Sequence, residues 1–269
     1  MTTAEDVLDL FKVTSPTEVA FSKWTGDATK VDVVPHVMAH RVSFVYDLTP
    51  EDVERVCNAT KRDRRNHALG DVKRKEAESV TDIVDWHPAF AFIHALHYAI
   101  ESLREIPTWL EFSRFIRDDP KANAMLWNPA CQMARTVSDA PDGPSWRVAW
   151  DSVRWRLGNA YYSFLREMYV VSNLRASGLD IRVHPLADAL FKVDFWCGRT
   201  ICSLFVKNAK FHKDNEGRKI SPRQLMRDAA PKFHFHDIQL DKATEWGRVH
   251  LPSTEQLREA AERLRVAVQ

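Results

Sequence analysis

The chain has 269 residues, of which 45% are hydrophobic and 28% charged, enough apolar material for one large domain or two smaller ones. Its formal net charge of +1 excludes a polycation that binds nucleic acid through overall charge, so a nucleic-acid surface would have to come from local basic clusters. No run of about 18 apolar residues predicts a membrane span, and the acidic start "MTTAEDVLDLF" does not resemble a signal peptide. We therefore expect a soluble, cytoplasmic protein without membrane partners.

Residues 1–140 have a mainly helical pattern and no catalytic motif, and we expect them to form a domain for recognition or partner binding. The segment "KRDRRNHALGDVKRK" within this half is rich in basic side chains. It is typical either of a solvated surface or of a patch that contacts phosphates. The candidate phosphate-binding residues are Arg62, Arg64, Arg65, Lys73 and Arg74. The loop-forming cluster "SDAPDGPS" then predicts the end of this domain.

Residues 145–269 alternate between helical and strand patterns. A long helix is predicted to start after Ser145 and to end before Gly178, where a C′ glycine is favoured. The short segment "DIRVHP" reads as a strand, and the ranges Ala189–Trp196 and Thr200–Lys207 predict a hairpin that turns at Gly198.

The last quarter of the chain continues this alternation. It starts with a basic loop that holds Lys210, Lys213, Arg218 and Lys219. Ser221 and Pro222 then predict the start of a short helix, which is followed by the strand "KFHFHDIQL" and by a terminal helix that begins with the capping box of Ser253 and Gln256. The predicted order after residue 145 is therefore helix, three strands, helix, strand and a final helix.

Charged residues in the predicted hairpin need an explanation, because the remaining positions look like core. Asp188, Lys192 and Asp194 share one face of the first strand, and Lys207 lies near the end of the second. One explanation is a solvated face with a cross-strand salt bridge, which contributes about 0.5 kcal/mol. The other is a metal-dependent phosphodiester site, in which carboxylates hold Mg²⁺ and a lysine assists the attacking water. Glu167, on the preceding helix, lies at the edge of its apolar stripe and could join such a site.

The order of elements resembles the core of the PD-(D/E)XK, or restriction-endonuclease-like, nucleases. The motifs that carry the resemblance are "FLREM", "KVDFW" and "SLFVKN". The resemblance implies an α/β (α+β) fold with an αβββαβ core over residues 145–269, and a site that binds Mg²⁺ or Mn²⁺. The resemblance places the first acid of the family at Asp194, with Asp188 as the alternative. It places the family's lysine at Lys207 and its helical acid at Glu167.

One position departs from the family pattern. Phe205 stands two residues before Lys207, where the family usually has an acid or Gln. The resemblance implies an endonuclease that cleaves DNA, with the basic residues on the phosphate backbone and with other protein subunits of a phage-defence, restriction or mobile-element system as partners. The departure keeps open an alternative, a catalytically degenerate nuclease fold that binds nucleic acid or assembles a complex.

Overall fold

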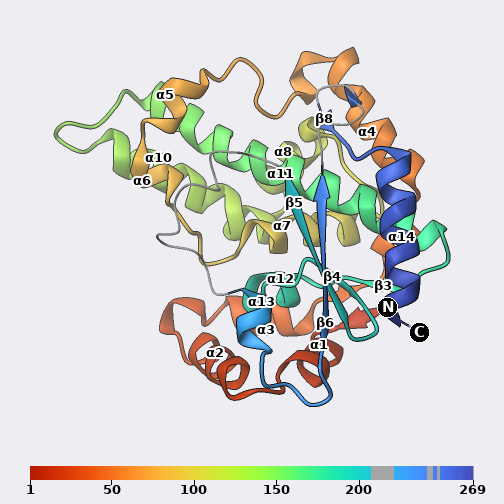
Figure 1. The fold of residues 1–269 in the computed structure, drawn as a ribbon. Helices are drawn as coiled ribbons and strands as arrows, with labels where there is room; N and C mark the ends of the chain where they lie inside the picture. The colour runs from red at the N-terminus through yellow and green to blue at the C-terminus, as the bar shows by residue number, and fades with distance from the viewer. Residues whose placement is uncertain (207–220, 241–244, 247–248, 269) are drawn as a thin grey trace. The chain divides into compact units, whose positions relative to one another are not determined.

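The computed structural model describes residues 1–206, 221–240, 245–246 and 249–268 (Figure 1). The protein is α+β, mostly helical with a small mixed sheet. Its residues form two compact units, one made of Met1–Pro50, Arg166–Trp246 and His250–Gln269, and the other of Glu51–Leu165 and Gly247–Val249. This division differs from the expected split into residues 1–140 and 145–269, because residues 1–50 group with the sheet.

The second unit is helical, which agrees with the pattern predicted for the first half of the chain. Amphipathic segments with a helical period form it, and the first twenty residues of the long helix α11 (Trp146–Ala176) complete it. Its other elements are α4 (Pro50–Arg62), η3 (Arg64–Asn66), α5 (Arg74–Glu78), α6 (Thr81–Val84), α7 (Phe92–Leu103), α8 (Trp109–Asp118), α9 (Pro120–Ala122), the π-helical turn η4 (Asn123–Trp127) and α10 (Asn128–Ser138).

Tyr161 lies at the centre of this unit and is 1% exposed. Its ring stacks on Phe112, and its hydroxyl donates a hydrogen bond of 2.7 Å to the carbonyl of Pro107. We expect Tyr161→Phe to lower the free energy of unfolding by about 1–3 kcal/mol, because it leaves a buried acceptor without its donor. Urea denaturation checks this, with Tyr98→Phe at a half-buried site as the control. Equal midpoints for Tyr161→Phe and wild type would contradict the assigned bond.

Residues 1–50 form the helical part of the first unit. The elements are β1 (Thr2–Thr3), α1 (Ala4–Phe11), α2 (Ser15–Thr25), η1 (Ala28–Lys30), α3 (Val33–Ala39), β2 (Arg41–Val42) and η2 (Phe44–Asp47). Helix α1 starts at a capping box between Thr3 and Asp6. Its buried Phe11 contacts the rings of Phe191, Trp196 and Phe233, with centroids 5.2–5.9 Å away. These aromatic contacts join the first helix to the sheet region some 180 residues later.

The sheet of this unit has the order β3–β4–β5–β6, which Figure 1 shows beside α13 and α14. Strands β3 (Ile181–Arg182), β4 (Phe195–Cys197) and β5 (Thr200–Val206) are antiparallel neighbours, whereas β5 and β6 (His234–Leu240) are parallel. The short helix α13 (Pro222–Leu225) lies between β5 and β6 in the chain. The small pair β7 (Glu245–Trp246) and β8 (Val249–His250) precedes α14 (Thr254–Val268), which packs against β5 and β6.

Several local predictions are confirmed. Helix α11 starts after Ser145 and ends before Gly178, whose φ of +87° is the left-handed conformation that glycine tolerates. The hairpin turns at Gly198, with φ of +55°. Ser221 caps α13 through a capping box with Gln224, and Ser253 and Gln256 form the corresponding bonds at α14.

The predicted strand Ala189–Trp196 is wrong over most of its length. Pro185–Phe191 is a helix, α12, and only Phe195–Cys197 is strand. His184 caps α12 by accepting the backbone N–H of Leu186, and Pro185 occupies the first turn, where its missing N–H costs nothing. Lys192 ends the helix in the left-handed conformation with φ of +62°. Asp188 therefore projects from a helix and does not share a strand face with Asp194.

Candidate active site

Three carboxylates of the first unit, from three different segments, interact electrostatically. Glu167 belongs to α11, Asp188 to the first turn of α12, and Asp194 to the bend between α12 and β4. Asp194 is anchored to the sheet, because its Oδ2 accepts a hydrogen bond of 2.7 Å from the backbone N–H of Leu204 in β5. This bond holds Asp194 against β5, the strand whose last residue, Val206, precedes Lys207 in the sequence.

The electrostatics of the three acids are coupled. Burial raises the pKa of the Glu167 carboxyl well above its usual value, and the charges of Asp194 and Asp188 raise it further. Burial and the charge of Asp188 also raise the pKa of Asp194, to about 7, although the Leu204 N–H acts in the opposite direction. Asp188 therefore disfavours the ionised forms of Glu167 and Asp194, and Asp194 disfavours that of Glu167, as in sites where carboxylates are gathered for chemistry.

This arrangement differs from the solvated salt bridge that the sequence also allowed. A carboxylate in an exposed salt bridge has a lowered pKa, as Asp63 has beside Arg65. Asp194 shows the opposite shift, and its causes are burial and a like charge. Retaining acidic groups at such a place costs stability, which indicates a role other than holding the fold.

Oxygen donors of this kind suit Mg²⁺ and Mn²⁺, which prefer carboxylates and water. In the part of the chain that the structure describes, no three His, Cys, Asp or Glu side chains lie close enough together to form a ready-made metal site. The three acids therefore interact across space, and holding an ion among them would require their side chains to move closer together.

The third strand supplies the position at which the family pattern is broken. Phe205 is 52% exposed at the end of β5 and lies opposite Gln239 of the neighbouring strand. Two residues earlier, Ser203 lies opposite Asp237, so this acid belongs to the same sheet face as Phe205. From sequence, the alternation in "HFHD" indicates first a strand and only second a set of ligands, and Asp237 does lie in the strand β6. Asp237 forms a salt bridge of 3.0 Å with Arg223.

The remaining predicted residues fall into two groups. Lys207 and the basic loop residues Lys210, Lys213, Arg218 and Lys219 lie outside the described residues. The candidates near residue 70 belong to the second unit, at exposed positions. Four of them have carboxylate partners: Arg64 with Asp71, Arg65 with Asp63, Lys73 with Glu76 and Arg74 with Glu78, at 2.7–3.9 Å.

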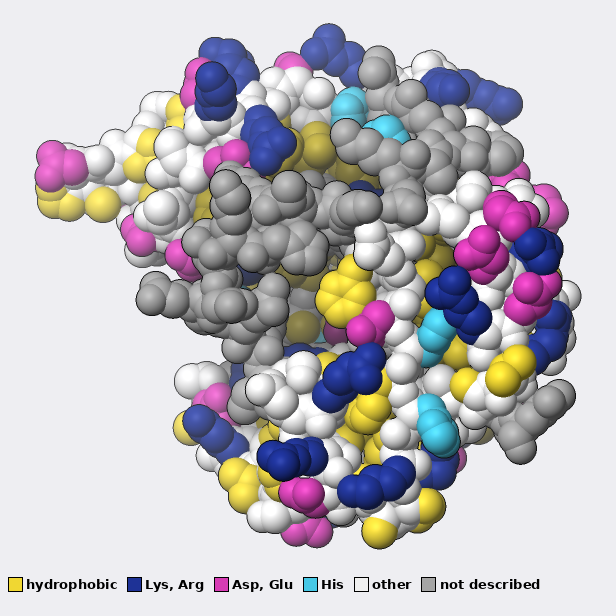
Figure 2. All heavy atoms as spheres, viewed as in Figure 1, with side chains coloured by type: hydrophobic (Ala, Val, Ile, Leu, Met, Phe, Trp, Pro, Cys, Tyr) yellow, Lys and Arg dark blue, Asp and Glu magenta, His cyan; other side chains and the backbone are white. Residues whose placement is uncertain are grey.

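This pairing reduces the local positive field of the segment. Of the five candidates, Arg62, an exposed residue in the last turn of α4, has no ion pair among those found between described residues. Figure 2 shows basic side chains interspersed with acidic ones over the described surface in that view. A phosphate that binds this segment would compete with the existing ion pairs for the same guanidinium and ammonium groups.

The chain was compared with protein-family models, with curated proteins and with solved structures, and none of the three comparisons found a match. Among the residues that the structure describes, no helix is both long and apolar enough to cross a membrane.

Proposed function

We propose that the protein is a metal-dependent endonuclease that cleaves phosphodiester bonds in DNA. The observation that carries the proposal is the electrostatic coupling of Glu167, Asp188 and Asp194: burial and neighbouring carboxylates raise the pKa of Glu167 and of Asp194, and Asp194 is hydrogen-bonded to β5. Partly buried acids that repel one another gain most from a divalent cation, because the cation offsets both the lost hydration and the repulsion.

The order of elements gives independent support. Among the described residues, helix α11, strands β3, β4 and β5, helix α13 and strand β6 follow one another with the short α12 inserted, and β6 joins the sheet parallel to β5. This order agrees with the αβββαβ core of the PD-(D/E)XK nucleases. On this proposal, Asp194 would take the place of the first acid and Glu167 that of the helical acid.

The acids, the Leu204 N–H and Lys207 would have different roles in the proposed reaction. Asp194, Asp188 and Glu167 would hold Mg²⁺ or Mn²⁺, which when bound stabilises charge on the phosphate and lowers the pKa of a bound water. The Leu204 N–H keeps the Asp194 carboxylate oriented. Lys207 would position the attacking water or take its proton, and the basic loop after it would bind the phosphate backbone.

A second candidate function is favoured by Phe205. An exposed aromatic ring at the position of an expected acid suits a degenerate site that binds nucleic acid or a protein subunit without cleavage. In either case we propose other proteins of a phage-defence, restriction or mobile-element system as partners.

Cleavage of plasmid and single-stranded DNA in the presence of Mg²⁺ or Mn²⁺ tests the proposal. We expect wild type to cleave, and both Asp194→Asn and Lys207→Ala to lose at least about 100-fold in rate, as for removal of a group that acts in the transition state. Asp228→Asn, an exposed acid in the same unit, is the matched control and retains full activity. Salt-sensitive DNA binding without cleavage by wild type would favour the second candidate.

A further inference from the structure

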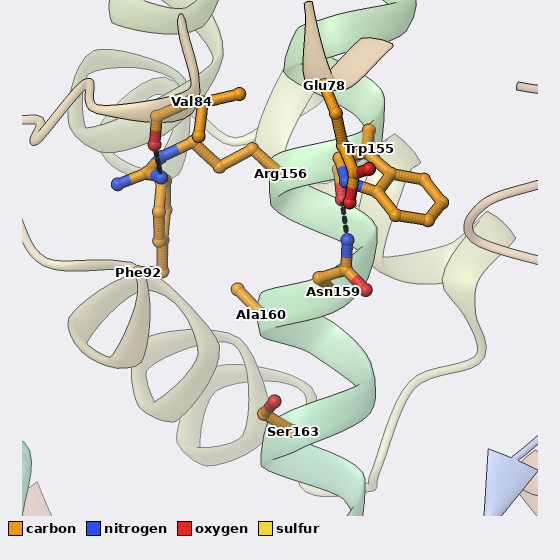
Figure 3. Close-up of a pocket in the computed structure, with 8 residues that line it drawn as sticks. All are labelled: Glu78, Val84, Phe92, Trp155, Arg156, Asn159, Ala160 and Ser163. Carbon is orange, nitrogen blue, oxygen red and sulfur yellow. Dashed lines mark hydrogen bonds between the residues drawn. The ribbon is translucent and has the colours of Figure 1, made fainter. Parts of the chain in front are cut away.

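A pocket of about 350 Å³ lies within the second unit, and all of its lining residues belong to Glu51–Leu165. One face of α11 forms its floor, with Arg156, Asn159, Ala160 and Ser163 at helical spacing. Figure 3 shows Arg156 extending to one side of this floor and Trp155 to the other. The walls come from α5, α6 and α7, and the volume is within the range of pockets that bind small molecules.

Arg156 has the properties of an anion-binding side chain. One of its terminal nitrogens donates to the carbonyl of Val84, and its guanidinium lies 5.3 Å from the centroid of the Phe92 ring. Its Nε is buried and has no hydrogen-bond partner among the described residues. Burial lowers its pKa, and Asp85 acts on it only through space. A guanidinium that is partly desolvated without an adjacent carboxylate is suited to a phosphate oxygen.

The opposite side of the pocket is suited to a flat ring. Trp155 is half-buried, and the Arg74 guanidinium lies 5.8 Å from its ring centroid. Glu78, which lines the same side, pairs with Arg74 at 3.0 Å. The exposed Asn159 donates its amide nitrogen to the carbonyl of Trp155 at 2.8 Å, which leaves its amide oxygen as an acceptor next to the ring. Figure 3 shows Glu78, Asn159 and the Trp155 ring close to one another. An aromatic surface with an amide and a carboxylate nearby is the usual means of binding a nucleobase.

We propose that this pocket binds a nucleotide, with the base against Trp155 and the phosphate at Arg156. The combination of an aromatic surface and an anion-binding group in one pocket favours this class over a purely apolar ligand, which would leave Arg156 desolvated and unpaired. The pocket lies in the other unit from the carboxylate cluster, so the inference does not depend on the proposed nuclease activity.

The nucleotide can be a free molecule or one unit of a single strand. Calorimetric titration of the full chain in EDTA distinguishes the two sources, with adenosine 5′-monophosphate, adenosine and a ten-residue oligodeoxyadenylate as probes. Tighter binding of the monophosphate than of the oligonucleotide identifies a free nucleotide, and the reverse identifies a strand. EDTA prevents divalent-ion-dependent cleavage during the titration.

Three variants assign the binding to the pocket. Arg156→Gln is expected to weaken binding of the phosphate-bearing probes at least about tenfold and to leave the weaker binding of adenosine nearly unchanged. Ser163→Trp places a bulky ring at an exposed position of the floor and is expected to abolish binding of all three probes. Arg147→Gln removes the same charge from an exposed site on the same helix, where its side chain is 83% exposed, and is expected to have no effect.

The same titrations can overturn the inference. Wild type that binds none of the probes at millimolar concentration contradicts it, as does binding that both pocket variants leave unchanged. Circular dichroism and urea midpoints of Ser163→Trp show whether it folds, and this variant tests the pocket even where Arg156→Gln proves unstable. Asp194→Asn should bind the probes like wild type, so failure of the nuclease proposal and failure of this inference remain distinguishable.

Discussion

Asp194→Asn is expected to stabilise the protein at pH 8 in the absence of divalent ions, by a few kcal/mol, although it removes the proposed activity. The folded protein raises the pKa of this carboxyl to about 7, and each pKa unit corresponds to about 1.4 kcal/mol. The amide carries no charge to bury, and its oxygen can still accept the hydrogen bond from Leu204.

The stability gained by Asp194→Asn is expected to depend on pH. A carboxyl with a raised pKa binds its proton more tightly in the folded state, so its contribution to stability is present near pH 4 and is lost as the pH rises through about 7. The variant lacks this titration. The advantage of Asp194→Asn should therefore be small at pH 5 and reach its full value above pH 7.

Urea denaturation in EDTA at pH 5 and pH 8 measures this difference, with Asp228→Asn as the matched substitution of an exposed acid. A variant that is less stable than wild type at pH 8 would show that the charge of Asp194 stabilises the fold. In that case the acid would be structural, and the argument for a site gathered for chemistry would fail.

Divalent ions are expected to produce the second large effect, a rise in thermal stability that depends on pH. At pH 8, Mg²⁺ at 100 times its dissociation constant would add about 2.7 kcal/mol, because it binds the folded protein alone. At pH 5 the effect should be much smaller, since Asp194, with its pKa of about 7, is then protonated and a cation must displace its proton.

Differential scanning calorimetry with and without Mg²⁺ checks this expectation. Glu167→Gln should remove most of the increase in midpoint at pH 8, because it takes away one of the three acids. Glu262→Gln, an exposed position on α14, should retain it. An equal increase at both pH values, or in both variants, would place the ion elsewhere on the surface.

Local signals explain which elements could be predicted from sequence. The structure agrees with the predictions that rested on local signals. These signals are the periodic apolar stripe of α11, the glycine at 178 and the serine caps at 221 and 253. Sequence analysis did not predict the short helix α12, because Lys192 and Asp194 alternate with apolar residues in the segment Ala189–Trp196, and this alternation favours a strand. Only the Pro185 start and the left-handed Lys192 decide between a helix and a strand.

The features that could not be predicted from sequence depend on long-range packing. The grouping of residues 1–50 with the sheet depends on contacts such as Phe11 with Trp196, which no local pattern encodes. The residues of the acidic cluster could be named from sequence, but their coupling could not, because Asp188 reaches Asp194 from a helix that was expected to be a strand. The ion pairs of Lys73 and Arg74 were visible as helical i,i+3 and i,i+4 spacings.

The most direct test of the central claim is a calorimetric titration of wild type and Asp194→Asn with Mn²⁺ at pH 8. The account predicts that wild type binds one or two ions with release of protons, and that the variant loses this binding while it remains folded. Equal binding by the two proteins, or no binding by wild type, would contradict a metal site at Glu167, Asp188 and Asp194.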